Sequence, residues 1–291
     1  MHIEVLVDVK TALGEGPLWD IDQQRLYFLD IPTGTVFRCT ADGRELRAWD
    51  LPGKVGSMAI RKDGKGAIVA LETGFAALDF RTGDVTPISD PEPDLPTTRL
   101  NDGKVDRRGR FLAGSMDMTE KAPLGSLYRL DPDFKVTKLE TGIVISNGPC
   151  WSPDDRTFYF HDSTAGEIRA YDYDIATGSL SNRRTFVTLD TPTGAPDGST
   201  VDAEGGLWSA QVFDAKIVRY LPDGTIDRII PMPVKKVSSV MFGGPNLDIL
   251  FVTSMAKPPL PHQPGDGVQR GSVFAVYDLG VRGIPEPRFG G

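Results

Sequence analysis

The sequence contains few of the residues that build disulfide frameworks or thiolate and imidazole metal sites. It has 2 cysteines, Cys39 and Cys150, and 3 histidines among its 291 residues. The cysteines form no CxxC pair and no secretory signal pattern precedes them, so we expect both to be reduced and partly buried. No run of eighteen apolar residues occurs, so no membrane-spanning helix is expected. These absences predict a cytoplasmic protein without a structural disulfide.

An excess of positive charge is also missing, because the formal net charge is −8. A nucleic acid or an anionic membrane surface requires a basic face for its phosphates, so neither is an expected partner. Hydrophobic residues make up 40% of the chain, which is enough to bury a full core. Small molecules or other proteins remain as possible partners, and we expect either a monomer or a weak homo-oligomer.

Glycine and proline are abundant, with 32 and 23 residues, and they separate short runs rich in Val, Ile, Phe, Tyr and Trp. This alternation is typical of strands joined by tight turns. Similar runs recur along the chain, each with a marker residue: Tyr27, Ile68, Leu112, Tyr159, Trp208 and Phe251. Successive markers are 41, 44, 47, 49 and 43 residues apart. A period of about 40 to 50 residues made of short strands indicates propeller blades of four strands.

Six such units predict an all-β fold, a six-bladed β-propeller with four-stranded antiparallel blades around a central metal channel. No linker or shift in composition divides the chain, so we expect residues 1–291 to form one propeller domain. The Pro-rich stretch SDPEPDLPTTR is expected to be a long loop within the ring. A strand around Ile3 to Val9 is expected to pair into the last blade, because closure of the ring removes an exposed sheet edge.

The stretch GIVISNGPCWSP places Asn147 four residues before Trp151, which the pattern assigns to the start of the first strand of its blade. The first strand of each propeller blade lines the central channel, so residues at this offset should form a ring about the axis. In the six units these residues are Glu15, Gly56, Asn101, Asn147, Asp197 and Ser238. Any one of them alone is an ordinary turn residue. Four of the six can supply an oxygen ligand: Glu15, Asn101, Asn147 and Asp197.

Two carboxylates and two amides that converge on a narrow channel predict a bound cation, because an unpaired buried charge is costly. Hard oxygen ligands suit Ca²⁺, Mg²⁺ or Mn²⁺, and they also accept Zn²⁺ or Fe²⁺. Three or four protein ligands leave coordination positions open, as in catalytic sites. A divalent ion there would polarise a carbonyl oxygen or lower the pKa of a bound water.

Four stretches together resemble the motifs of the senescence marker protein/gluconolactonase/regucalcin family: GEGPLWD, RLNDGKVDRRGRFLAGSM, ISNGPCWSPDDRTFYFHDS and PDGSTVDAEGGLWSAQV. The similarity extends from about Leu13 to about Tyr277. Members of this family are six-bladed propellers that hydrolyse aldonolactones with one central divalent ion. The resemblance therefore implies metal-dependent hydrolysis of a sugar lactone to its aldonic acid, within carbohydrate metabolism.

Carried over by position, the resemblance implies that Glu15, Asn147 and Asp197 are the metal ligands. It also implies that Asp197 is the catalytic acid or base, and that Arg99 and Asn101 of the RLND motif bind the substrate. A guanidinium and an amide group can both donate hydrogen bonds to lactone and hydroxyl oxygens.

One position departs from the family pattern. Animal members have a further acidic substrate contact eighteen residues beyond the asparagine of the RLND motif, and here that position is Thr119. We therefore expect hydroxyl recognition to differ on that side. Other substrate contacts are expected on the loops formed by residues 116–124 and 257–269.

Two other functions are compatible with such a ring. A related metal propeller could hydrolyse phosphotriesters or aryl esters, and a non-catalytic calcium-binding propeller could use the ring as a structural site. A serine hydrolase is not favoured, because the sequence has no GxSxG motif, although Ser146 and Ser163 lie near Asn147 and His161. His161 lies in a strand-like run, and we expect it to be a half-buried residue rather than a base.

Overall fold

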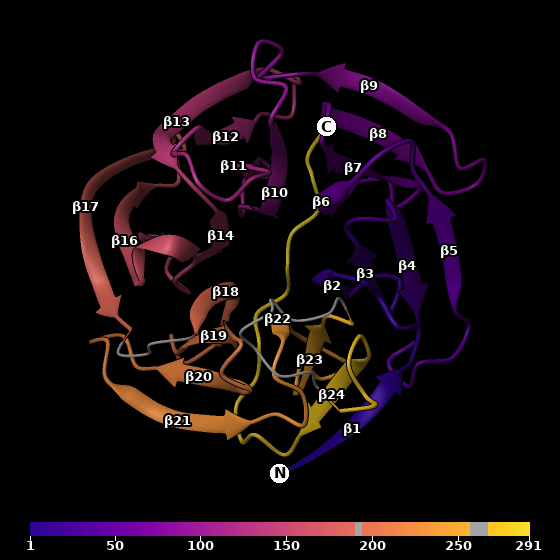
Figure 1. The fold of residues 1–291 in the computed structure, drawn as a ribbon, viewed down its shortest axis with the longest axis vertical. Helices are drawn as coiled ribbons and strands as arrows, with labels where there is room; N and C mark the ends of the chain where they lie inside the picture. The colour runs from indigo at the N-terminus through magenta and orange to yellow at the C-terminus, as the bar shows by residue number, and fades with distance from the viewer. Residues whose placement is uncertain (190–193, 257–266) are drawn as a thin grey trace.

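The computed structural model describes residues 1–189, 194–256 and 267–291, and within them it contains six sheets of four strands each. The sheets follow one another around a central axis (Figure 1). In the described part of the chain, the only helical element is the 3-10 helix η1 (Ser163–Ala165). It follows that no helix of these residues could span a membrane. The predicted six-bladed β-propeller of antiparallel blades is confirmed.

Four strands form each blade, and in Figure 1 they run outward from the axis. The first blade contains β2 (Gly14–Asp20), β3 (Arg25–Asp30), β4 (Thr35–Cys39) and β5 (Arg47–Asp50). The second contains β6 (Val55–Ile60), β7 (Gly66–Leu71), β8 (Gly74–Asp79) and β9 (Val85–Ser89). The third contains β10 (Thr98–Val105), β11 (Phe111–Asp117), β12 (Gly125–Leu130) and β13 (Val136–Ile143).

The remaining blades repeat this order. The fourth contains β14 (Ser146–Trp151), β15 (Thr157–Asp162), β16 (Glu167–Asp174) and β17 (Ser179–Thr188). The fifth contains β18 (Ala195–Val201), β19 (Leu207–Val212), β20 (Lys216–Tyr220) and β21 (Ile226–Pro231). The sixth contains β22 (Val237–Gly243), β23 (Ile249–Ser254), β24 (Val273–Tyr277) and β1 (His2–Val7).

The N-terminal strand closes the ring as predicted. It pairs antiparallel with β24, with Ile3 opposite Val276 and Val5 opposite Phe274. The strand ends at Val7, two residues earlier than the sequence pattern indicates. The first and last parts of the chain therefore share one sheet, and β1 covers the outer edge of β24.

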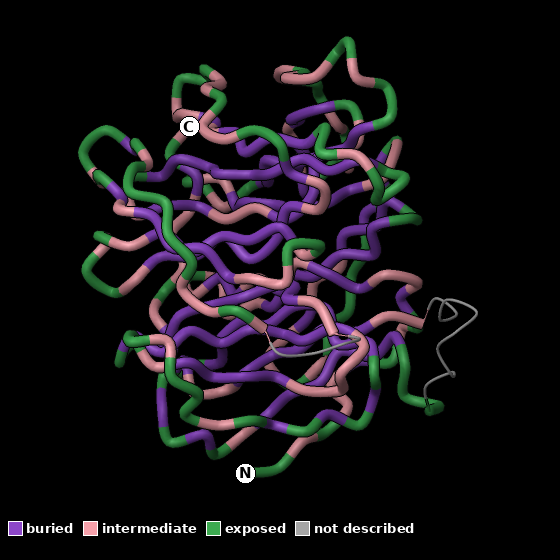
Figure 2. Tube along the Cα trace, turned by 60° about the vertical axis from the view of Figure 1, so that its left-hand side comes forward, coloured by how far each residue is buried: buried purple, intermediate pink, exposed green. Residues whose placement is uncertain are grey.

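Burial decreases from the axis outward. All six residues of β7 are buried, whereas in the outer strand β5 only Trp49 is buried. Figure 2 shows the same pattern, with buried strands through the body of the molecule and exposed loops around it. The inner strands are covered on both faces by neighbouring blades, as when Trp19 of the first blade stacks on Phe251 of the sixth at 5.8 Å between ring centroids. Strands buried on both faces read as continuous apolar runs, which is why the repeat is visible in the sequence.

Both cysteines are free, as expected, but they are more buried than the sequence suggests. Cys39 is 0% exposed and Cys150 is 2% exposed. Each lies within a hydrophobic cluster of packed strands rather than in a loop. The prediction of partial burial was therefore wrong, because small thiols fill the space between blades.

The last residues of the chain form a segment that the sequence pattern did not indicate. Residues 278–291, here called the C-terminal strap, cross the ring from the sixth blade towards β6 (Figure 1). The backbone N–H of Ala203 donates to the carbonyl of Arg282 at 2.8 Å, and that of Phe289 donates to the carbonyl of Ile60 at 2.8 Å. Arg288 also donates to both carboxylate oxygens of buried Asp20, at 2.8 and 2.9 Å. The strap therefore ties blades together across one end of the channel.

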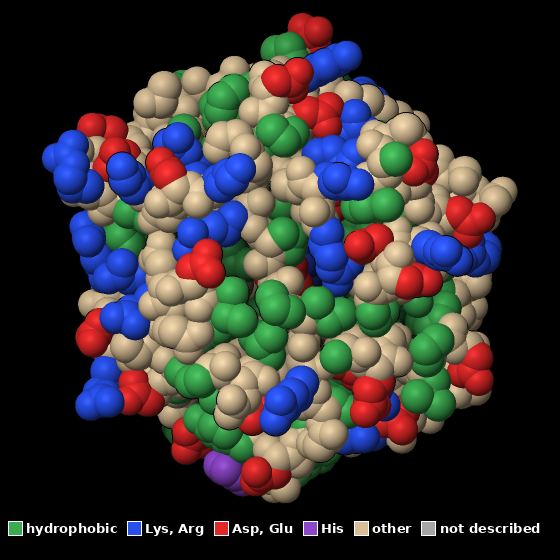
Figure 3. Space-filling model, turned by 180° about the vertical axis from the view of Figure 1, so that it is seen from behind, with side chains coloured by type: hydrophobic (Ala, Val, Ile, Leu, Met, Phe, Trp, Pro, Cys, Tyr) green, Lys and Arg blue, Asp and Glu red, His purple; other side chains and the backbone are tan. Residues whose placement is uncertain are grey.

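The face seen from behind in Figure 3 carries both signs of charge. Lys and Arg side chains stand beside Asp and Glu side chains around its rim, and hydrophobic side chains gather nearer its centre. This mixed pattern agrees with the net charge of −8 and does not present a continuous basic surface.

Candidate functional site

All six inner strands have a register irregularity at the predicted ring position. The pairing shifts between Glu15 and Leu18 in β2 and between Asn147 and Cys150 in β14. The other shifts lie at Val55/Ser57, Leu100/Gly103, Pro196/Ser199 and Val237/Val240. A β-bulge leaves a residue unpaired and re-aims the side chain beside it. The repeated bulges therefore mark the same ring position in every blade, and the side chains presented there are those of the five residues other than Gly56.

The Gly-Pro pair after Asn147 belongs to this bulge and not to a turn before the strand. β14 begins at Ser146, and Trp151 is its last residue, so the prediction that Trp151 starts the strand was wrong. Gly148 has a φ of 65°, which a glycine adopts without strain. Pro149 lies within the bulge, where the ladder needs no N–H donor. The apolar run before Asn147 is the end of the preceding blade.

Two aspartates that the sequence analysis did not single out fix the loops that lead to the ring. Asp30, the last residue of β3, accepts the backbone N–H groups of Ala12 and Leu13 at 3.1 and 3.0 Å. Asp162, the last residue of β15, accepts those of Val144 and Ile145 at 2.7 and 3.1 Å. Each loop enters an inner strand just before Glu15 or Asn147. The signal in the sequence is the aspartate that ends both RLYFLD and TFYFHD.

The predicted substrate-binding pair belongs to a continuous hydrogen-bonded chain. The Nη1 group of Arg99 donates to Oδ1 of Asn101 at 2.6 Å. Nδ2 of Asn101 donates to the carbonyl of Ser146 at 2.8 Å and to Oδ1 of Asn147 at 3.0 Å. Arg99 is 8% exposed, so it is a buried member of β10 and not a solvated loop cation.

The hydrogen bonds of Asn147 determine which way its amide group faces. Ser163 Oγ donates to the carbonyl of Pro196 at 2.7 Å, so its lone pairs accept the Asn147 Nδ2 group at 2.8 Å. Oδ1 of Asn147 then lies on the side of Asn101. An amide oxygen has two lone pairs and Asn101 uses one of them, so the other is available to a cation.

His161 is a positioning residue of this site and is more buried than the sequence suggests. Its exposure is 0%, whereas we expected a half-buried residue. Its Nε2 lies 2.9 Å from the backbone carbonyl oxygen of Asp197. A carbonyl only accepts, so the Nε2 atom carries the proton and donates. Burial lowers the pKa of His161 to about 4, which keeps the ring neutral. The ring thus joins β15 to the backbone of Asp197.

Gly148 packs directly on the His161 ring, and a Cβ at this position would overlap that ring. We expect Gly148→Ala to lower the free energy of unfolding by about 3 kcal/mol, through overlap and positive-φ strain. Gly142 is a matched control, because its φ is 75° but nothing lies within 4 Å of a Cβ there. Gly142→Ala should cost about 1 kcal/mol. Equal losses in urea unfolding of the two variants would contradict the packing of Gly148 on His161.

Three buried carboxylates make the centre of the ring acidic. Glu15, Asp102 and Asp197 are 6, 7 and 7% exposed. Burial, then the charges of Asp197 and Asp102, raise the pKa of Glu15 well above its usual value. Burial, then the charge of Asp102, raise the pKa of Asp197 in the same way. Such shifts show that the carboxylates lack sufficient positive charge around them.

Arg99 is a cation that faces this acidic centre. Burial lowers the pKa of Arg99 to about 10, while the charges of Glu15 and Glu120 oppose that decrease. The guanidinium therefore stays charged at neutral pH. Asp102 is held separately, because it accepts the backbone N–H groups of Gly103 and Gly148, both at 2.8 Å. Each carboxylate oxygen of Asp102 therefore accepts one hydrogen bond from the backbone.

One cavity contains all five predicted site residues. Glu15, Arg99, Asn101, Asn147 and Asp197 line it together. Thr119 does not line it, since its hydroxyl donates to Asp117 at 2.6 Å. The next residue, the exposed Glu120, lines the cavity instead. An acidic residue thus lines the cavity one position beyond Thr119.

The two loops predicted to contact substrate have different outcomes. Met116 and Glu120 of the loop 116–124 line the cavity. Most of the loop 257–269 lies outside the described residues, at positions 257–266.

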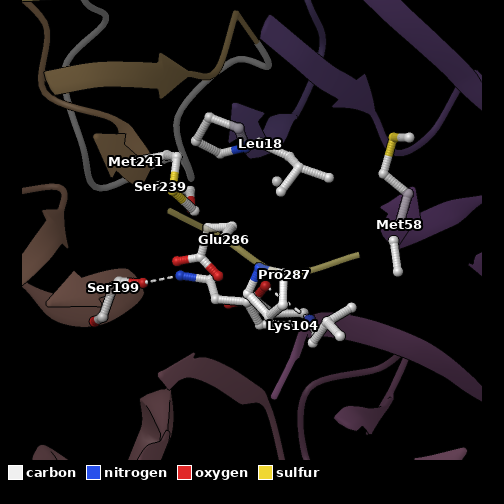
Figure 4. A pocket seen from close by; sticks show the side chains of 14 residues that line it. Leu18, Met58, Lys104, Ser199, Ser239, Met241, Glu286 and Pro287 are labelled. Atoms are coloured by element: carbon white, nitrogen blue, oxygen red, sulfur yellow. Dashed lines mark hydrogen bonds between the residues drawn. The ribbon is translucent and has the colours of Figure 1, made fainter. Parts of the chain in front are cut away.

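A second, narrower cavity lies below the ring, next to the C-terminal strap. Figure 4 shows Lys104 and Glu286 pointing into it, between Leu18, Met58 and Met241. Nζ of Lys104 donates to the carbonyl of Ser199 at 2.7 Å, which ties β10 to β18. These are the strands that contain Asn101 and Asp197. Burial raises the pKa of Asp102, and the charge of Lys104 opposes that increase.

The residues of the ring fit a divalent cation. Glu15 and Asp197 supply carboxylates whose charges are under-compensated, and Asn147 presents an amide oxygen with a free lone pair. Within the described ranges, no group of three or more His, Cys, Asp and Glu side chains forms a metal cluster. The predicted set contains only two such side chains, so its third ligand is the amide. Thiolate or imidazole coordination does not occur in this set.

Comparison with known proteins shows an extended similarity. The family model described as SMP-30/Gluconolactonase/LRE-like region matches residues 13–256. Regucalcin of Xenopus laevis is 36% identical over 301 residues, which cover 100% of this chain and 99% of that protein.

Two solved structures share the fold over nearly the whole chain. A luciferin-regenerating enzyme superposes with a TM-score of 0.93 at 33% identity, covering 99% of each chain. A protein of Agrobacterium tumefaciens described as the calcium-binding protein regucalcin superposes with a TM-score of 0.89 at 30% identity, covering 98% of this chain and 96% of that one.

Proposed function

The chain belongs to the SMP-30/gluconolactonase/LRE-like family, and on that premise we propose that it hydrolyses a sugar lactone to the aldonic acid with one bound divalent ion. The observation that carries this proposal is the convergence of Glu15, Asn147 and Asp197 with Arg99 and Asn101 in one cavity. The first three would hold the ion. The other two lie beside them, where a lactone would dock.

The open ligand set supports catalysis over a purely structural ion site. Three protein ligands leave coordination positions for small molecules. When bound, the ion would supply Lewis-acid stabilisation of negative charge that develops on the lactone oxygen. The remaining N–H groups of Arg99 would orient the substrate by donating to its hydroxyl or carbonyl oxygens. Glu120 would accept hydrogen bonds from hydroxyl groups on the same side.

Asp197 is the proposed proton carrier. Asp197 lies in the same cavity as the two proposed substrate-binding residues, and its carboxylate, once ionised, can accept a proton from water. A water oxygen bonds to the lactone carbonyl carbon while Asp197 takes a proton from that water. The ring C–O bond then breaks, and Asp197 returns the proton to the departing alkoxide. The products are a hydroxyl group and a carboxylic acid. His161 holds the Asp197 backbone in place during both transfers.

Relative activity on three substrate classes tests the proposal. Metal-loaded protein would be assayed with five- and six-membered aldonolactones, an aryl acetate and a dialkyl aryl phosphotriester, using a pH indicator or released phenol. We expect kcat/KM for the best lactone to exceed the values for the aryl acetate and the phosphotriester by at least about 100-fold. A better rate on the aryl ester or the phosphotriester would contradict the lactone assignment. Binding of the ion without turnover of any substrate would favour the calcium-binding alternative.

A further inference from the structure

The cavity above the ring has two chemically different sides. Arg99, Asn101 and Glu120 line it from the third blade. Besides the proposed ion ligands Glu15 and Asp197 and the charged Lys236, the first, fifth and sixth blades contribute apolar lining residues: Leu13, Ile31, Val212, Phe213 and Met255. Figure 1 places β10–β13 across the ring from β22–β24, so the polar and apolar sides oppose each other. Met116 and Ile145 flank the polar side.

Hydrogen-bonding capacity is concentrated on the third blade. Asn101 uses both amide hydrogens, on Ser146 and Asn147, and its oxygen accepts from Arg99. Nη1 of Arg99 also donates to the carbonyl of Leu100 at 3.1 Å. Nε and Nη2 of the guanidinium, together with the Glu120 carboxylate, remain for a bound molecule. A substrate hydroxyl can therefore be paired along this side.

Among the residues that the structure describes, the opposite side offers few partners to a hydroxyl group. Val212 and Ile31 are 6 and 2% exposed, so they form a fixed apolar wall. Apart from Glu15 and Asp197, which would hold the ion, the charged residue described on this side is Lys236, which is 3% exposed and has interaction partners of its own. A hydroxyl placed against the wall would lose water without gaining a partner, whereas a methyl group would bury apolar surface.

We propose that the cavity selects an amphiphilic lactone, hydroxylated along one edge and deoxygenated at the other, as in a terminally deoxygenated aldonolactone. The inference rests on the proposed lactonase function and narrows its substrate class. The hydroxylated edge would face Arg99 and Glu120. The terminal methyl group would face Val212 and Met255.

A matched pair of substrates tests this selection. L-rhamnono-1,4-lactone and L-mannono-1,4-lactone share every ring hydroxyl and differ only in the terminal group, which is methyl in the first and hydroxymethyl in the second. We expect kcat/KM for the rhamnonolactone to be about 10 to 100 times higher. Equal rates, or a preference for the mannonolactone, would overturn the inference while leaving the lactonase proposal intact. No turnover of either lactone, or of any other aldonolactone, would overturn both.

Substitutions on the apolar wall provide a second readout. Val212→Thr keeps the shape of the side chain and adds a hydroxyl, so it should reduce the preference for the methyl-bearing lactone several-fold. Val136→Thr is the matched control, because Val136 lies in the outer strand β13 and does not line the cavity. The control should keep the wild-type ratio. A ratio that changes equally in both variants, or in neither, would show that Val212 does not select the substrate.

Discussion

Replacing Asp197 by asparagine is expected to lower kcat for lactone hydrolysis by about 10³-fold when the divalent ion is saturating. The asparagine keeps the shape of the side chain and an oxygen that can face the ion, but it cannot take a proton from water. A high ion concentration compensates for weaker ion binding by the variant. The loss of kcat that remains is then due to the missing proton transfer. Initial rates measured over a range of ion concentrations separate the two effects.

A matched substitution on the other side of the ring is the control. Glu286 also points into the channel, but it belongs to the strap side and does not line the cavity above the ring. Glu286→Gln should therefore change kcat by no more than about twofold, because the substitution lies outside the cavity that would hold the lactone. Near-normal turnover of ion-saturated Asp197→Asn would show that another group moves the proton.

The second large effect concerns the acidic centre when no ion is bound. Glu15→Gln is expected to raise the free energy of unfolding of metal-free protein by about 1 to 3 kcal/mol, because it removes a buried charge that Asp197 and Asp102 repel. The same variant should lose the stabilisation that an added ion provides. For the native chain that stabilisation is about 2.7 kcal/mol at an ion concentration 100 times the Kd. Chemical unfolding with and without the ion measures both quantities.

The pH dependence of this effect has a definite sign. The pKa values of Glu15 and Asp197 are raised in the folded state, so the folded metal-free protein binds protons more tightly than the unfolded chain does. The stability that these protons provide is present below the unfolded pKa values, near 4. It is lost as the pH rises through the raised folded values. Ion affinity should increase over the same range, because the ion displaces those protons. The opposite result would be a free energy of unfolding of the metal-free native chain that increases with pH above 4, relative to that of metal-free Glu15→Gln. That result would contradict the account.

The sequence was sufficient to predict the ring because the strands around the axis are buried on both faces. Their apolar runs recur at nearly constant spacing, and one offset then brings Glu15, Asn101, Asn147 and Asp197 to the inner strands. The local conformation was harder to predict. Asn-Gly-Pro is a common turn phrase, and nothing near Asn147 distinguishes a turn before a strand from a bulge inside one.

Other features depend on contacts that one sequence does not reveal. Glu120 was not singled out, because a single sequence does not show which side chain of the loop faces the cavity. The burial of His161 depends on Gly148 of the neighbouring strand and on the backbone of Asp197. The apolar wall comes from three blades that share no motif at those positions. The strap has no repeat partner, since it lies outside the six units.

The central claim is that one ion on the ring of Glu15, Asn147 and Asp197 makes the protein a lactonase. The most direct test is to strip the protein of metal and titrate it with a single divalent ion while following hydrolysis of a saturating aldonolactone. The account predicts no turnover at the start, a linear rise and a plateau at one ion per chain, with no such rise for Glu15→Gln. Full turnover by the stripped protein, or tight binding of one ion without hydrolysis of any lactone, would contradict it.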